Sequence, residues 1–174
     1  MLDVSLSYNK FRFIGNEFLT WILFLLNNKD KYHKIFQTDI ASLSLGNKLI
    51  IENRQKNSSE TVLIKGENAN FKESMPAFKK GSLVSEINLI YSENEKKWQF
   101  TIKAESLAIL NLKHPNIGFY ESKEDLGGFV LDKTFHINKA VEYIDNLFMN
   151  FIKLRVSKNW ALKVFPEIKN WINS

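Results

Sequence analysis

Hydrophobic residues gather into one nearly continuous run close to the start of the chain. The run covers nine residues, 18–26, is interrupted only by Thr20, and ends at the polar segment 27–31. Nine residues of helix rise roughly 14 Å, about half the hydrocarbon core of a bilayer, so this run is too short to cross a membrane. We therefore predict a helix over 16–27 that is buried on nearly every side. Glu17 is expected in its first turn, where the helix dipole favours an acid.

Shorter segments with strand-like patterns surround this helix along the chain. We predict strands within 2–13, towards the end of 32–45, and at 48–52, 60–65, 83–91, 98–104 and 107–112. Gly46-Asn47 is a two-residue hairpin signal, and 53–59 reads as a polar turn. The segment that starts at Trp98 alternates most cleanly. Its pattern places Gln99, Thr101 and Lys103 on a face directed to solvent.

Two further regions of the chain differ from these strands. Residues 70–80 carry apolar side chains at helical spacing, and Gly81 stands where a C-terminal cap belongs. Because Pro76 lies inside that pattern, the helix is expected to begin late or to kink there. The region 116–133 contains Gly127-Gly128 and is locally acidic, so we predict a loop.

The C-terminal part of the chain has a helical period. From about Asn138 one apolar stripe comprises Val141, Ile144, Leu147, Phe148, Phe151 and Leu154. A break at 157–159 leads to a last helix, which Pro166 shortens or bends. The order of elements predicts an α+β fold: a mostly antiparallel sheet with an N-terminal buried helix, one inserted helix and a C-terminal helical pair. We expect one domain over 1–174, in which 136–174 is a helical extension packed on the rest.

Composition narrows the function classes. The chain has 174 residues, no cysteine and a formal net charge of +5. The lack of cysteine excludes disulfides, thiolate metal sites and cysteine nucleophiles, and fits a reducing cytoplasm. A basic balance suits nucleic acid or an anionic membrane surface, although an AT-rich genome would also enrich lysine. No small-residue cleavage site follows the apolar run, so we expect a cytoplasmic protein without a membrane partner.

Residue patterns for catalysis or metal binding are weak. His33, His114 and His136 each stand without a second ligand at metal-binding spacing, and no glycine-rich phosphate loop occurs. The acidic residues in 121–125 lack the apolar surroundings that raise a carboxyl pKa for acid–base work. We therefore predict a protein that is not an enzyme and has no cofactor and no metal site. A metal-dependent nuclease would need three acids converging in a pocket.

Basic residues are the more suggestive group. The candidate DNA contacts are Lys65, Lys79, Lys80, Lys96, Lys97, Lys103, Lys113, Arg155 and Lys158. Lysines at the turns of a meander can share one exposed face with a strand lysine and hold phosphates through charge alone. The alternative is that these residues are solvated and scattered around the molecule. The aromatic residues fall mainly at core spacing, so no base-stacking role is assigned to them.

Three stretches together resemble the C-terminal half of the bacterial recombination-associated protein RdgC family. The stretches are Gly15-Asn16-Glu17-Phe18-Leu19-Thr20-Trp21; Ile64-Lys65-Gly66-Glu67 with Glu73, Ala77, Phe78, Lys80-Gly81 and Leu83-Val84; and Trp98-Gln99-Phe100-Thr101-Ile102 with Leu107 and Leu112-Lys113-His114-Pro115. The resemblance covers roughly 11–160 in order and spacing. It implies a non-enzymatic protein that binds duplex DNA with little sequence preference, forms dimeric rings and restrains a recombinase.

The resemblance also marks individual residues. Lys65, Lys80 and Lys113 are the basic residues within matching motifs, which makes them the preferred DNA contacts. Ser82 stands where the family usually has lysine, so a contact there is weakened. Only 14 residues precede Gly15, so no counterpart of the family's N-terminal half lies in this chain, and ring closure draws on that half.

The sequence therefore predicts a non-catalytic, nucleoid-associated protein that binds double-stranded DNA through backbone phosphates, with a homodimer as one possible assembly. The competing class is a protein-interaction module that keeps the fold only. The two classes of function predict different surfaces. Lysines that converge on one concave face favour DNA, whereas an exposed patch of Phe and Trp on the C-terminal helices favours a protein partner.

Overall fold

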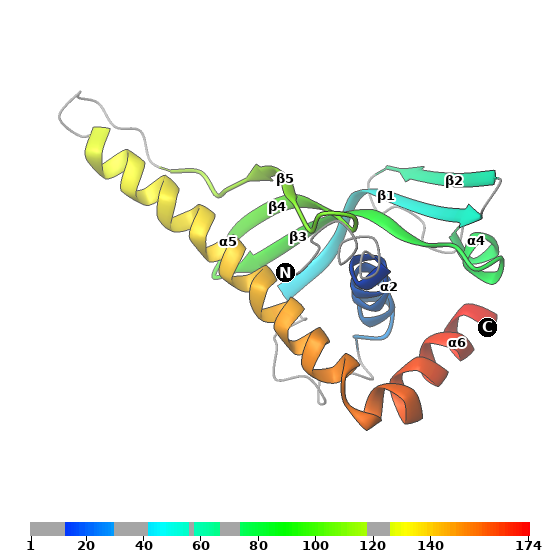
Figure 1. The fold of residues 1–174 in the computed structure, drawn as a ribbon. Coiled ribbons are helices and arrows are strands. Elements are labelled where there is room, and N and C mark those ends of the chain that lie inside the picture. The colour runs from blue at the N-terminus through cyan, green and yellow to red at the C-terminus, as the bar shows by residue number, and fades with distance from the viewer. Residues whose placement is uncertain (1–12, 30–41, 56–57, 67–73, 118–125) are drawn as a thin grey trace, which may run out of the picture.

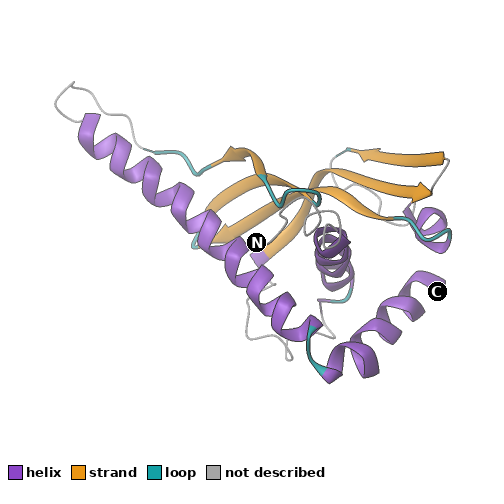
Figure 2. Cartoon of the chain, in the orientation of Figure 1, coloured by secondary structure: helices purple, strands orange, loops and turns teal. Residues whose placement is uncertain are grey.

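The computed structural model describes residues 13–29, 42–55, 58–66, 74–117 and 126–174. The elements, in chain order, are α2 (Phe13–Asn27), β1 (Leu43–Gln55), β2 (Ser58–Lys65), α4 (Met75–Lys79), β3 (Leu83–Glu93), β4 (Lys96–Lys103), β5 (Ile109–Lys113), α5 (Leu126–Arg155), the π-helical turn η4 (Trp160–Val164) and α6 (Phe165–Asn173). The strands form an antiparallel sheet in the order β2-β1-β3-β4-β5. The predicted α+β class is confirmed (Figures 1 and 2). The strand predicted within 2–13 lies outside the described residues except for Phe13, which is the first residue of helix α2 and not part of a strand.

Helix α2 is the middle layer of the fold. Every residue from Phe18 to Leu25 is at most 4% exposed, as the apolar run predicted. One side of the helix packs against β1 and β3, where the Thr20 hydroxyl accepts a hydrogen bond from the Val84 amide at 3.1 Å. The other side meets the C-terminal helices, and the Phe18 ring lies 5.1 Å from that of Phe148. Burial on both sides explains why the apolar stripe extends around the whole helix.

Helices α5 and α6 close this core from the side opposite the sheet. Ile144, Leu147 and Phe151 of the predicted stripe are buried on α5. Further along the chain, the Trp171 ring of α6 lies 5.4 Å from the Phe24 ring of α2. The predicted break between the two helices is confirmed, because α5 ends at Arg155 and the helical path resumes near Trp160. Figure 1 shows α2 enclosed between the sheet and these helices.

The predicted hairpin at Gly46-Asn47 is wrong, because both residues lie inside β1. The ladder between β1 and β3 is irregular here, with a register shift between Leu45 and Leu49. Asn88 of β3 fills the gap: its Oδ1 accepts a hydrogen bond from the Asn47 amide at 3.2 Å. A Cβ on Gly46 would come within 2.0 Å of that oxygen. The glycine therefore permits close approach of a side chain rather than a turn.

The predicted loop over 116–133 is wrong in its last part. Helix α5 begins at Leu126, twelve residues before the predicted start near Asn138, and includes Gly127-Gly128. The first ten residues carry exposed apolar side chains, among them Leu131 and Phe135, so the segment has no one-sided stripe to reveal a helix. Figure 1 shows this start of α5 extending past the edge of the sheet.

Of the smaller predictions about the ends of elements, some are confirmed and others are wrong. The helix at Pro76 does begin late, and Gly81 closes it with φ +87° and a hydrogen bond from its amide to the Phe78 carbonyl, as predicted. The polar turn over 53–59 is shorter than predicted, since β1 continues to Gln55 and β2 begins at Ser58. Glu17 is not in the first turn of α2, because the helix begins at Phe13.

Candidate nucleic-acid interface

The sheet has one face that the described helices leave open. Buried side chains such as Leu49, Ile87 and Phe100 point from successive strands towards α2, and residues beside them in sequence point to the other side. We call that other side the open face. In Figure 1, α2, α5 and α6 all lie beneath the sheet, opposite this face. Charged strand residues can therefore gather on this face around its centre, where Asn88 and Thr101 are buried.

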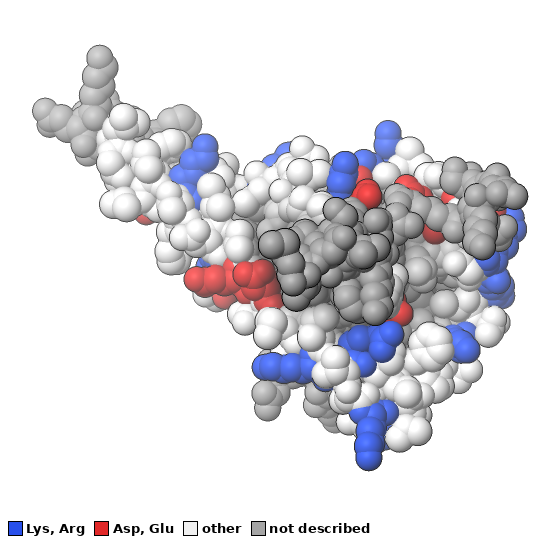
Figure 3. Space-filling view, viewed as in Figure 1, with Lys and Arg blue, Asp and Glu red and all other residues white. Residues whose placement is uncertain are grey.

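Four of the nine predicted DNA contacts lie on the open face. They are Lys65 on β2, Lys97 and Lys103 on β4, and Lys113 on β5, and all four are exposed. In the strand register, Lys103 is paired with Glu86 and Lys113 with Gln99. Blue side chains stand along the upper border of Figure 3, above the sheet. The structure thus places two of the three lysines that the family resemblance favoured, Lys65 and Lys113, on the same face, at its two opposite edge strands.

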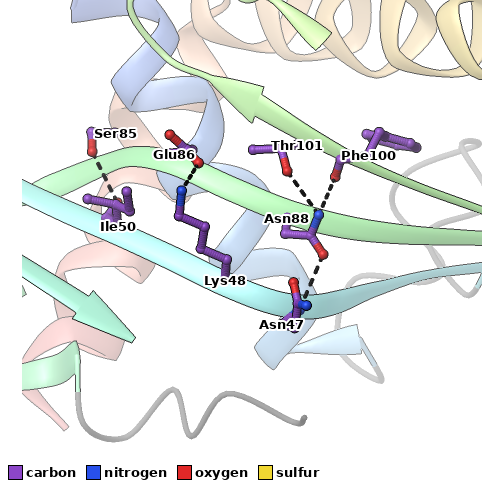
Figure 4. Close-up of polar contacts among 8 residues, drawn as sticks. All are labelled: Asn47, Lys48, Ile50, Ser85, Glu86, Asn88, Phe100 and Thr101. Atoms are coloured by element: carbon purple, nitrogen blue, oxygen red, sulfur yellow. Dashed lines mark hydrogen bonds and ion pairs between the residues drawn. The ribbon is translucent and has the colours of Figure 1, made fainter. Parts of the chain in front are cut away.

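Lys48 is a fifth lysine of the open face and was not predicted as a contact. It lies directly opposite Lys65 in the register of β1 and β2. Its Nζ forms an ion pair with Glu86 Oε1 at 2.5 Å (Figure 4). The sequence places Lys48 in a strand. However, the irregularity of the ladder between Leu45 and Leu49 hides the face on which it lies.

Three predicted contacts lie away from the open face. Lys79 is the last residue of α4 and Lys80 follows it, and the Lys80 ammonium pairs with Glu60 Oε1 at 3.1 Å. Glu60 has the parity of buried Ile64 on β2, so this pair belongs to the helix side of the sheet. Lys96 shares the parity of buried Trp98 and faces α5. The prediction that these three turn lysines join Lys103 on one face is wrong.

Arg155 and Lys158 are also separated from the open face by the core. The Arg155 guanidinium donates to Glu17 Oε2 at 2.6 Å and lies 5.3 Å from the centre of the Trp160 ring. These contacts tie the end of α5 to α2, a structural role that explains Arg155 without DNA. Lys158 is exposed at the junction that leads to η4. Figure 3 shows further basic residues around α4 and the C-terminal helices, so part of the positive charge is scattered.

Two hollows mark the open face and differ in charge. One, of about 360 Å³, is lined by Asn47, Lys48, Lys65 and Gly66, and we call it the Lys65 hollow. The other, of about 340 Å³, lies where β3 and β4 meet the start of α2. Its lining includes Lys103 together with Glu52, Glu86 and Glu105, and we call it the Lys103 cleft. An anion is favoured at the first hollow and repelled by three carboxylates at the second.

A buried hydrogen-bond network fixes the centre of the open face (Figure 4). Asn88 donates through Nδ2 to the Phe100 carbonyl at 3.1 Å and to the Thr101 hydroxyl at 3.0 Å. Its Oδ1 accepts from Gln99 Nε2 at 2.8 Å and from the Asn47 amide. Thr101 is 3% exposed, so its predicted position in solvent is wrong. The network holds three strands in register beneath the lysines.

Two histidines that are far apart in the sequence lie together. The rings of His114 and His136 are nearly parallel, with centroids 6.4 Å apart. His136 is 6% exposed, and its Nδ1 has no hydrogen-bond partner among the described residues. Burial, together with the positive charge of nearby Lys96 and His114, holds the pKa of His136 below its ordinary value. His33 lies outside the described residues.

Neither a metal site nor a membrane span occurs in the described part of the chain. No group of three or more His, Asp or Glu side chains within it is arranged to hold a metal ion. Among the same residues, no helix combines the length and the apolar character needed to cross a bilayer. Glu52, Glu86 and Glu105 line the Lys103 cleft together, but among the described residues these acids are not arranged to hold the metal ion that a nuclease would need. Asp39 and the acidic segment 121–125 lie outside the described residues.

Comparison with known proteins gives no family assignment. No protein-family model matches the chain, and no curated protein sequence is significantly similar to it. The functional argument for this protein therefore depends on the surface described above.

Proposed function

We propose that this protein binds double-stranded DNA through its backbone phosphates, using the open face of the sheet, and that it is a divergent, non-catalytic relative of the recombination-associated RdgC family. The observation that carries the proposal is the gathering of Lys65, Lys97, Lys103 and Lys113 on one face, from three different strands. Adjacent strands are about 4.8 Å apart, so lysines on β2 and β4 span roughly 14 Å. A duplex carries about one negative charge per 1.7 Å, and several phosphates fit that distance.

The aromatic residues of the sheet favour a duplex over single-stranded DNA. Tyr91, Trp98 and Phe100 all belong to the buried core, and no described aromatic side chain of the strands lies on the open face. Proteins that hold single strands without sequence preference stack bases on exposed aromatic rings. Phe13 of α2 lines the Lys103 cleft, but the strands of the open face carry lysines and no such rings. Such a face is suited to phosphates, which predicts binding without sequence preference in a nucleoid-associated protein.

The test is fluorescence anisotropy with a labelled random-sequence duplex across a salt series. Because each phosphate contact contributes about 0.9 to the slope of log K against log salt, three to four contacts predict a slope of about −3. The triple variant Lys65→Gln/Lys103→Gln/Lys113→Gln should bind at least tenfold more weakly at about 0.1 M salt, with a shallower slope. An unlabelled duplex of another sequence should compete equally.

The matched control is Lys153→Gln/Lys158→Gln/Lys163→Gln, which removes the same charge from exposed positions on the C-terminal helices. It should stay within about twofold of the parent protein, since it leaves the open face unchanged. Equal losses in the two triple variants would show that net charge and not the open face is responsible. No binding by the parent protein at low salt would contradict the proposal altogether.

A second candidate function is protein binding through the start of α5. Leu126, Val130, Leu131 and Phe135 are between 53% and 71% exposed on that segment. The predicted patch of Phe and Trp on the C-terminal helices differs, since Trp160 is buried and Trp171 is half-buried. A Leu131→Lys/Phe135→Lys variant discriminates the two functions, because it should leave DNA affinity unchanged and abolish only protein association. Sedimentation of parent and variant tests whether that association is a homodimer.

A further inference from the structure

We propose that Glu86 is a built-in counter-charge that limits how strongly the open face binds phosphate, by keeping Lys48 engaged. This inference deepens the proposed function and rests on it. Glu86 lies on β3, between the lysines of β1 and β4, and forms the ion pair with Lys48. It also lies opposite Lys103 in the register of β3 and β4. One carboxylate thus stands between two lysines of the face that would otherwise meet phosphate.

The burial of the pair makes Glu86 the fixed partner. Its side chain is 12% exposed, whereas that of Lys48 is 35% exposed. A lysine has a flexible four-carbon stem and three rotatable donors, so Lys48 is the group that can change partners. A carboxylate in this position does not rotate into solvent to make way for an incoming phosphate. We therefore expect its negative charge to stay beside the lysines when phosphate binds.

The Lys65 hollow shows where a released Lys48 would act. Both Lys48 and Lys65 line it, and the two residues are directly paired across β1 and β2. Gly66 also lines the hollow and has no atom within 4 Å of the position that a Cβ would occupy, so space is open there. With the carboxylate of Glu86 replaced by an amide, two ammonium groups would face one phosphate in the hollow. With Glu86 charged, Lys65 acts there without the full charge of its neighbour.

The experiment measures DNA affinity and its salt dependence for Glu86→Gln, using the same labelled duplex. Glutamine keeps the size of the side chain and an oxygen that accepts from Lys48, but removes the charge. We expect affinity to rise about five- to tenfold at about 0.1 M salt, and the slope to steepen by about 0.9, the value for one added phosphate contact. Glu142→Gln on the exposed side of α5 is the matched control and should change neither quantity.

A second variant keeps the inference testable if Glu86→Gln does not fold. Lys48→Met/Glu86→Gln replaces the ion pair with uncharged side chains of similar length, a change that folded proteins often tolerate. Because Lys48 is already engaged in the parent protein, the double variant should bind DNA within about twofold of it. A loss of about fivefold or more would mean that Lys48 contacts phosphate in the parent protein, which overturns the inference.

The outcomes separate this inference from the proposed function. If the parent protein binds and Glu86→Gln binds no more tightly, the counter-charge role is wrong while DNA binding stands. If Glu86→Gln and Glu142→Gln gain equally, net charge explains the effect and the inference also fails. If neither the parent protein nor any variant binds, both proposals are refuted.

Discussion

Two glycines in helices predict opposite responses to the same substitution. A Cβ on Gly15 of α2 would come within 1.9 Å of the Ala104 carbonyl oxygen, which is backbone just after β4. A Cβ on Gly127 of α5 would meet no atom within 4 Å. Alanine favours a helix over glycine by up to about 1 kcal/mol, so propensity alone predicts that both substitutions stabilise. Packing reverses the sign at Gly15 only.

The size of the effect at Gly15 follows from the distance that the backbone must move. Real Cβ contacts lie beyond 3.0 Å, so α2 and Ala104 must separate by more than an ångström. That movement strains the hydrogen bond from Asn16 Nδ2 to the Val84 carbonyl, now 2.8 Å, and loosens the packing of Phe18. Overpacking a core costs about 1–3 kcal/mol. A contact of 1.9 Å with backbone places the cost at the upper end of that range, about 3 kcal/mol, so after a propensity gain of about 1 kcal/mol we expect Gly15→Ala to destabilise by about 2 kcal/mol.

Urea unfolding followed by tryptophan fluorescence measures both variants, because Trp21 and Trp98 are buried in the core. For a chain of this size, about 2 kcal/mol corresponds to a melting temperature lower by roughly 4–8 °C. Gly127→Ala should instead raise stability by about 0.5 kcal/mol, through propensity and a restricted unfolded state. Equal stability of Gly15→Ala and the parent protein would refute the close approach of α2 to Ala104.

Three further predictions concern single residues. Asn88→Asp removes the hydrogen bonds donated to Phe100 and Thr101 and sets a carboxylate against a carbonyl, so it should cost about 3 kcal/mol in urea unfolding at neutral pH; an unchanged midpoint would contradict the network. The pKa of His136 is lowered by burial. The unfolded chain therefore takes up a proton near pH 6.5 when the folded protein does not, so stability should fall as pH drops from about 7 to 5. His136→Leu should flatten that pH dependence, and an equally steep curve would assign it to other groups. Arg155→Gln should lower stability by about 1 kcal/mol, through the lost Glu17 pair and Trp160 contact, yet leave DNA affinity within twofold; weaker DNA binding would restore Arg155 as a contact.

The fold class could be predicted because its main elements are simple patterns. The run 18–26 leaves no polar side for solvent, which requires a helix enclosed on all sides. In β4 the alternation of Trp98, Phe100 and Ile102 confirms the predicted strand and its buried face, although Thr101 on the other face is buried as well. The predicted helix cap at Gly81 is confirmed, because such a cap depends only on the local backbone conformation. Each of these elements could be predicted from the residues next to it in sequence or from the pattern of residues on one of its faces.

Two errors arose where local signals misled the prediction, and their physical reasons differ. Gly46-Asn47 has the local chemistry of a turn, but the side chain of Asn88, distant in sequence, occupies the space beside Gly46 and accepts from Asn47. The start of α5 has glycines and exposed apolar residues, which local rules assign to a loop. The pairing of His114 with His136 likewise joins segments whose proximity no spacing along the chain reveals. Long-range packing overrides the local signal at Gly46, whereas the start of α5 is helical although its apolar side chains are exposed.

The candidate interface was only partly predictable because strand faces depend on irregularities in the ladders. Counting alternate residues assigns a face correctly while the register is regular, as for Lys103 beside buried Ile102. The ladder of β1 shifts before Leu49, and a count along β1 therefore loses Lys48. The charge pattern of the face depends on that residue, since Lys48 brings Glu86 into the row of lysines. A list of basic residues could predict the sign of the surface but not the carboxylate within it, and we expect that carboxylate to set the strength of phosphate binding.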